Sequence, residues 1–241
     1  MKQSRRAHYV LIFILTAFTL VAALYLRSVP IFENADEAEH LLFMHYLLEN
    51  GELPVIQSGA EMAAQTDLTL QWNNQSHHAP LYYLLGAGLI SWTQRDDIRD
   101  YLRTNELIFL RDTTENNANK WLHLPTAPTG DTHLAVYTLR LASIVLGCAT
   151  LLLIHRAASY FFTNATGPLL TTAFAATLPT FIVVHSSVSN DALVIFFYTA
   201  GIAWMLRVYS RRSLNSLDTA LISLILAGIA LTKLTGVSLV G

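Results

Sequence analysis

Long apolar runs alternate with polar stretches along the chain, and the runs are long enough to cross a lipid bilayer. Residues 9–26 carry no charge, and their eighteen positions approach the roughly 20 needed to cross about 30 Å of hydrocarbon. Four further apolar runs follow a long polar segment, at residues 134–154, 168–184, 192–206 and 219–240. The pattern predicts one all-α domain over residues 1–241: a polytopic transmembrane helical bundle of about five spans. A large non-cytoplasmic loop, 27–133, follows the first span and is expected to carry juxtamembrane helices.

Positive residues beside the runs predict the orientation of the chain. Lys2, Arg5 and Arg6 precede the first span and place the N-terminus in the cytoplasm. A cleaved signal peptide is the alternative, but its apolar region would be too long, and bulky residues stand where a cleavage site would need small ones. With the N-terminus inside, further basic residues fall on the cytoplasmic side: Arg156, Arg207, Arg211 and Arg212. We therefore expect a multi-pass protein of the cell (plasma or inner) membrane.

A sixth span at residues 80–92 is the rival topology. Its thirteen residues are too few to cross the bilayer, and a run of this length is more typical of an interfacial or re-entrant segment. A span here would also reverse every later segment and place Arg207, Arg211 and Arg212 outside. The five-span topology is favoured.

Composition agrees with a membrane protein and excludes several kinds of site. Hydrophobic residues make up 53% of the chain and charged residues 13%, against about 25% charged in soluble domains. Cys148 is the only cysteine, so neither a disulfide framework nor a cysteine-based metal site can form. Adjacent His77 and His78 cannot both face one metal on a regular element, and zinc would need two or more further ligands at compatible spacing. No metal or other cofactor is therefore indicated, and no basic patch suggests nucleic acid.

The loop after the first span begins with a predicted helix over residues 34–50. Asn34 fits the N-cap, Glu37 the third position of a capping box, and Gly51 the stop. The helix carries an apolar stripe and is therefore expected to lie along the membrane surface. The stripe comprises Leu41, Met44, Leu47 and Leu48.

Acidic residues gather in the first turn of this helix. Asp36 and Glu37 lie on the same side as His40 by helical spacing. Acids complement a helix N-terminus, and a capping role is favoured for Glu37. Capping explains Asp36 less well, because an acid at the lip of the membrane is placed to meet a lipid-borne substrate.

The order of several short segments resembles the GT-C glycosyltransferases, in the branch of protein O-mannosyltransferases and bacterial aminoarabinose transferases. Residues 30–54 resemble the first-loop signature of this family, in which an Asp-Glu pair opens a juxtamembrane helix. Residues 79–83 resemble the second loop element, usually Pro-Pro-Leu-Tyr-Tyr, with Ala79 departing from it. Residues 140–143, 189–192 and 231–236 echo later segments, so the resemblance covers most of residues 30–240.

The resemblance implies transfer of a sugar from a polyprenyl-phosphate donor to a lipid, glycan or protein acceptor at the outer face. By resemblance, Asp36 is the general base and Glu37 its neighbour or the partner that orients the acceptor, with His40 on the substrate side. Arg140 and Lys233 lie within spans, where charged residues are expensive, and are candidates to bind the donor phosphate. Snorkelling to the headgroups is the alternative for both. Asp191 is a second acidic candidate, although an N-cap role is favoured for it.

Two other classes of protein fit parts of the pattern. A transporter or lipid flippase would also carry intramembrane Arg and Lys and a helix broken at Pro179. A non-catalytic membrane scaffold is the other alternative. GT-C enzymes of this branch usually have about twice as many spans, an implication of the resemblance, so the chain is expected to be the N-terminal portion of such an enzyme and to be inactive alone if the acceptor site is missing.

Overall fold

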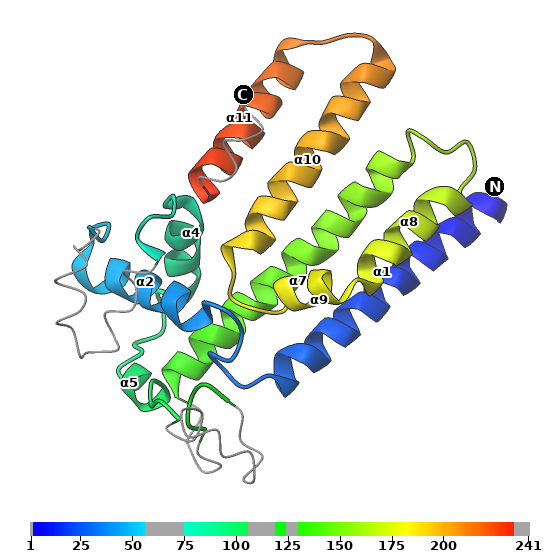
Figure 1. Ribbon diagram of the computed structural model, residues 1–241. Coiled ribbons are helices and arrows are strands. Elements are labelled where there is room, and N and C mark those ends of the chain that lie inside the picture. Colours follow the sequence, from blue (N-terminus) through cyan, green and yellow to red (C-terminus); the bar gives the residue numbers. More distant parts are fainter. Residues whose placement is uncertain (1, 56–74, 106–118, 124–129, 234–241) are drawn as a thin grey trace. The chain divides into compact units, whose positions relative to one another are not determined.

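The computed structural model describes residues 2–55, 75–105, 119–123 and 130–233 of the chain, and these residues form helices joined by turns (Figure 1). The described residues contain no strand, and one isolated antiparallel bridge joins Thr104 to Trp121. The chain divides into two compact units. The first unit comprises Met1–Leu26, Ala79–Tyr82 and Arg140–Gly241, and the second comprises Arg27–His78 and Tyr83–Leu139. The all-α prediction is confirmed for the described residues.

Three described helices are long and apolar enough to cross a membrane. They are α1 (Lys2–Ser28), α7 (Asp131–Ala158) and α10 (Asn190–Arg211). Each extends beyond the apolar run that predicted it, and α10 includes the polar residues Asn190 and Asp191, as its short run required. These helices give the chain the character of a membrane protein.

The other two predicted spans differ from the expectation. The run at 168–184 is not one helix, because α8 (Thr166–Thr177) and α9 (Pro179–Val184) are separated at Leu178, which is extended with ψ 121°. The cause is Pro179, whose ring disfavours helical geometry in the preceding residue. Helix α11 (Ser216–Thr232) ends before Lys233, which is extended with φ −154°. The part of the predicted last span at 234–240 lies outside the described residues.

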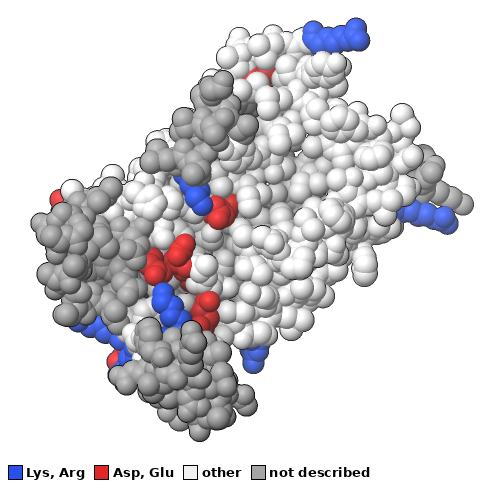
Figure 2. All heavy atoms as spheres, viewed as in Figure 1, with Lys and Arg blue, Asp and Glu red and all other residues white. Residues whose placement is uncertain are grey.

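Within the first unit, α10 and α11 pair as an antiparallel hairpin (Figure 1). The two helices approach closely where Gly228 faces the ring of Phe197, and a Cβ at this glycine would lie 2.7 Å from that ring. A capping box between Asn215 and Asp218 starts α11. Apart from the grey residues, most of the surface drawn in Figure 2 carries neither acidic nor basic side chains, as expected where helices face lipid.

In the second unit, α2 (Glu37–Asn50) packs on α4 (Leu81–Ile90) and a short helix α5 (Ile98–Tyr101) follows. The ring of Phe43 stacks on Tyr83 with centroids 3.8 Å apart, and Met44 occupies the space beside Gly86. Leu41 and Met44 of the predicted apolar stripe are fully buried. These two residues of the stripe therefore pack on protein, and the position of the helix along the membrane surface stays a prediction.

Candidate functional site

The candidate site is built on a tight turn that leads into α2. The helix begins at Glu37, three residues later than predicted, and its N-cap is Asp36 instead of Asn34. The predicted stop is confirmed, because Gly51 adopts φ 70° and its N–H bonds to the carbonyl of Leu47. The N-terminal difference arises because residues before Glu37 form a turn with two non-glycine residues at positive φ, Phe32 at 69° and Asp36 at 58°.

Asp36 presents a carboxylate that does not cap the helix. An N-cap residue normally has extended backbone geometry and accepts a bond from the start of the helix. Asp36 instead is left-handed, makes no side-chain cap bond and is exposed. Left-handed geometry in a non-glycine residue costs energy and is found often at functional sites. Its carboxylate is accessible to a molecule that approaches the turn.

Glu37 stabilises the turn from inside the protein. Its side chain is fully buried, and Oε2 accepts a hydrogen bond from the N–H of Phe32 at 2.8 Å. The carboxylate thus reaches further back along the chain than the capping box expected with Asn34, and the N-cap of the helix is Asp36. Glu37 therefore closes the turn that positions Asp36.

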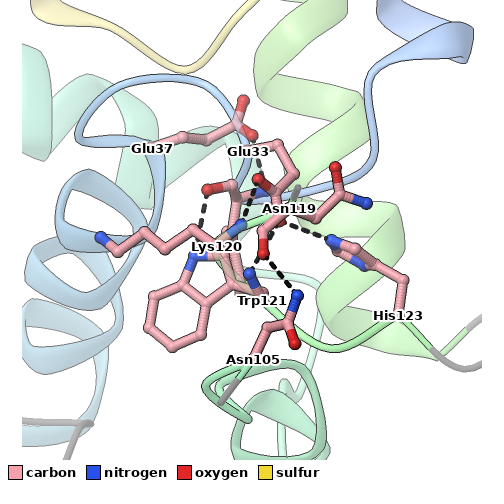
Figure 3. A network of polar contacts seen from close by, with 8 residues as sticks. Glu33, Glu37, Asn105, Asn119, Lys120, Trp121 and His123 are labelled. Atoms are coloured by element: carbon pink, nitrogen blue, oxygen red, sulfur yellow. Dashed lines mark hydrogen bonds and ion pairs between the residues drawn. The ribbon is translucent and has the colours of Figure 1, made fainter. Parts of the chain in front are cut away.

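A second set of hydrogen bonds, which we call the Glu33 clamp, joins the turn to residues 120–123 (Figure 3). The Glu33 carboxylate accepts the backbone N–H groups of Lys120 at 2.8 Å and Trp121 at 2.9 Å, and lies 2.8 Å from His123 Nε2. The indole N–H of Trp121 donates to the carbonyl of Phe32 at 3.1 Å. Phe32 is thus bonded at its N–H by one acid and at its carbonyl by the indole, which fixes its strained geometry.

Lys120 supplies positive charge beside this acidic turn. Its Nζ lies 3.3 Å from Glu39 Oε1, and its ammonium also lies 5.0 Å from the centroid of the Trp121 ring. Glu39 is buried while Lys120 is half exposed. The pair compensates a carboxylate that would otherwise be buried in the first turn of α2 without a cation.

His40 contacts the site through Tyr83 of α4. His40 Nδ1 lies 3.0 Å from the Tyr83 hydroxyl, and both side chains are buried. Burial raises the pKa of this hydroxyl, and the negative charge of Asp36 raises it further. The hydroxyl therefore stays protonated and is within electrostatic range of the Asp36 carboxylate. Asp36 is therefore exposed at the start of α2, while Glu37 and His40 are buried beside it, and a shared role in substrate binding stays a prediction.

The sequence did not single out Glu33, Tyr83 or Trp121 as site residues. Tyr83 belongs to the segment that resembles the second loop element of the family, so that segment was the available signal. Glu33 and Trp121 meet across a long sequence separation, and no local pattern marks such a contact.

The remaining predicted residues lie in the first unit. Arg140 is fully buried, and its Nη1 donates to the carbonyl of Leu26 in the last turn of α1 at 2.8 Å. A cation at this end of a helix satisfies a terminal carbonyl and complements the helix dipole. Binding of the donor phosphate by Arg140 stays a prediction.

Asp191 and Lys233 form an ion pair, with Nζ and Oδ1 2.6 Å apart. The N-cap of α10 is Ser189, whose hydroxyl accepts the N–H of Asp191, so the N-cap role favoured for Asp191 was wrong. Ser189 stands immediately before the helix, and its short side chain reaches the backbone N–H of Asp191. The acid is left free to pair with Lys233 in the first turn of the helix.

Among the described residues, no three His, Cys, Asp or Glu side chains gather to hold a metal ion. No protein-family model, characterised protein or solved structure matches the chain.

Replacing Glu33 by Ala should destabilise the second unit by about 2–4 kcal/mol, because the N–H groups of Lys120 and Trp121 lose a charged acceptor. The midpoint of thermal unfolding in detergent measures this loss. Glu49→Ala removes an exposed acid from α2 and serves as the matched control, with an expected change within about 0.5 kcal/mol. Equal midpoints for the two variants would show that the Glu33 clamp does not hold the turn.

Proposed function

We propose that the chain carries the catalytic base of a membrane glycosyltransferase that uses a polyprenyl-phosphate sugar donor. Asp36 takes the proton from the acceptor hydroxyl while that oxygen forms a bond to the anomeric carbon. The bond between the anomeric carbon and the phosphate oxygen breaks, and the lipid phosphate leaves with the electron pair. A positioned base contributes about 10²–10⁴-fold to such a step.

The observation that carries the proposal is the state of the Asp36 carboxylate. It is exposed, makes no cap bond and follows a turn held by Glu37 and by the Glu33 clamp. A general base needs these properties: access to the substrate, a free carboxylate and a fixed position. The resemblance to GT-C enzymes, in which an Asp-Glu pair opens a helix after the first span, supports the same assignment.

The proposal includes a topology finer than the three span-length helices. We place α8 with α9, and α11 with the residues after it, as two further spans, giving about five. The N-terminus is cytoplasmic, and the loop 27–133 with its site is on the outer side of the cell membrane. This arrangement presents Asp36 to a lipid-linked donor and to an acceptor outside the cell.

Transfer of label tests the function directly. Membranes that contain the protein are incubated with polyprenyl phosphates that carry a tritiated hexose or pentose, and label is followed into lipid, glycan and protein fractions. We expect protein-dependent transfer from one donor class. Uptake of the lipid into vesicles without any transfer would favour the transporter or flippase alternative, and neither activity would favour a scaffold.

The Asp191–Lys233 pair gives a prediction about donor binding. Lys233→Ala should weaken binding of a fluorescent polyprenyl phosphate about tenfold or more, because a charge-assisted hydrogen bond to the phosphate is lost. Asp191→Asn keeps the shape of the acid and removes its competing charge, so it should bind the probe at least as tightly as the wild type. Equal affinity of the wild type and Lys233→Ala would remove Lys233 from the phosphate site.

The topology is tested by labelling single cysteines in a Cys148→Ala background with a membrane-impermeant maleimide. Asp100→Cys should react in intact cells, and Arg211→Cys only after the membrane is opened, because basic residues beside spans stay in the cytoplasm. Both positions are exposed in the structure. The reverse pattern of labelling would overturn the orientation.

One observation favours the transporter alternative. The chain is extended at Leu178, between α8 and α9, and interrupted helices form binding sites in many secondary transporters. Uptake of the labelled lipid into vesicles, in the experiment above, tests this alternative.

A further inference from the structure

Helix α4 has two faces, and the described residues cover only one of them. Tyr83, Gly86 and Ile90 face the interior of the second unit: Tyr83 stacks on α2, Gly86 touches Met44, and Ile90 is fully buried. The opposite face follows helical spacing and consists of large apolar side chains that are about half exposed: Leu84 53%, Leu85 50%, Leu89 48% and Trp92 62%. We call these four residues the α4 outer face.

The register of α4 against α7 fixes how deep this face lies. The N–H of Gln94 donates to Asp131 at the start of α7, and a Cβ at Gly86 would touch Leu139 of the same helix at 3.4 Å. Gln94 therefore lies level with Asp131, and Gly86, which comes earlier in the chain, lies level with Leu139, which comes later in α7. The segment from α4 to Gln94 runs antiparallel to the first part of α7, and α4 lies beside residues inside that helix.

Helix lengths convert this register into a depth. The 28 residues of α7 extend about 42 Å, against about 30 Å for the hydrocarbon of a bilayer. Leu139 lies about 12 Å from the start of α7, which places it at or inside the boundary of the hydrocarbon if α7 crosses the membrane. Leu134, near the start of α7, is itself 44% exposed. The lipid-facing surface of this helix thus begins above the level of Gly86.

The polar residues that follow α4 lie beside the start of α7, nearer that end of the helix than the α4 outer face does. Asp97 Oδ1 accepts the N–H of Thr132 at 3.0 Å and its hydroxyl at 2.7 Å, so this acid sits at the first turn of α7. Trp92 stands between the apolar face and this polar segment, and its indole N–H is satisfied by the carbonyl of Leu89 at 3.0 Å. An apolar face, then a tryptophan, then charged residues is the order found at a membrane–water boundary.

We propose that α4 is a re-entrant helix of the membrane, with the α4 outer face in contact with lipid acyl chains. Its 10 residues extend about 15 Å, so it enters the bilayer and cannot cross it. Leu84 and Leu85 lie among the acyl chains, Leu89 nearer the surface, and Trp92 at the headgroup boundary. A water-exposed patch of four adjacent large apolar side chains would be costly, and lipid removes that cost. The same helix carries Tyr83 of the candidate site on its covered face.

Spin-label accessibility tests the proposal without reference to any catalytic activity. Single cysteines at positions 85, 89 and 92 in the Cys148→Ala background are spin-labelled, and the full chain is reconstituted into phosphatidylcholine vesicles. Collision of each label with oxygen, which concentrates in lipid, and with a water-soluble nickel chelate is then measured. Phe13→Cys, on the exposed face of α1, is the lipid control, and Asp100→Cys is the water control.

We expect labels at 85 and 89 to match the Phe13 control, with nickel collision several-fold lower than at position 100. The ratio of oxygen to nickel collision should fall from position 85 to position 92, because the helix rises towards the surface. Nickel access at 85 and 89 equal to that at 100 would overturn the proposal in favour of a water-facing helix. Low collision with both reagents would also overturn it, because a second copy or another protein would then cover the face. All labelled positions are exposed, so the substitutions do not disturb packing, and size-exclusion profiles matching the unlabelled chain verify this.

Discussion

Asp36→Asn should lower the rate of sugar transfer by about 10²-fold or more while folding and membrane insertion stay unchanged. The amide keeps the shape of the side chain and cannot accept the proton. No side-chain cap bond depends on this carboxylate, so the helix should not lose stability. The rate is measured with a labelled polyprenyl-phosphate sugar in the active enzyme, and thermal unfolding in detergent reports the fold.

Glu37→Gln is the matched control for this experiment. The amide oxygen of Gln can still accept the N–H of Phe32, so the turn should persist and the loss of rate should be much smaller. Glu37→Ala removes that acceptor from a buried site and should cost about 1–3 kcal/mol of stability. Near-wild-type transfer by Asp36→Asn would remove Asp36 as the base, whatever the behaviour of Glu37.

Arg140→Met should destabilise the first unit by about 2–4 kcal/mol. The substitution keeps much of the volume of the side chain but leaves the carbonyl of Leu26 without its donor, at about 1–3 kcal/mol, and removes a cation from the end of α1. Arg156→Met changes an exposed arginine of the same helix and should alter stability by about 0.5 kcal/mol or less. The midpoints of thermal unfolding give the comparison.

Binding of a fluorescent polyprenyl phosphate distinguishes the two roles considered for Arg140. If Arg140 only stabilises the end of α1, the Arg140→Met variant should bind the probe as tightly as the wild type at a temperature where both are folded. A folded Arg140→Met variant with wild-type stability and strongly weakened binding would instead identify Arg140 as a phosphate ligand and contradict the packing role.

Local patterns in the sequence determined the elements that depend on neighbouring residues alone. The uncharged run at 9–26 predicted α1, and the run at 192–206 with its polar flank predicted α10, because hydrophobic length is a property of one segment. Gly51 predicted the end of α2, because only glycine adopts φ 70° there without strain.

Only the tertiary structure decided what each of these side chains does. Glu37 was expected to cap its own helix, but in the folded chain its buried carboxylate accepts the N–H of Phe32, which belongs to the preceding turn. The Glu33 clamp joins residues far apart in the chain, and Lys233 finds Asp191 across two helices. The apolar stripe of α2 was expected to face the membrane surface. In the structure α4 packs against α2, and the α4 outer face is the exposed apolar surface. A hydrophobic pattern states that a face must be buried, while the partner that buries it, protein or lipid, depends on how the helices pack.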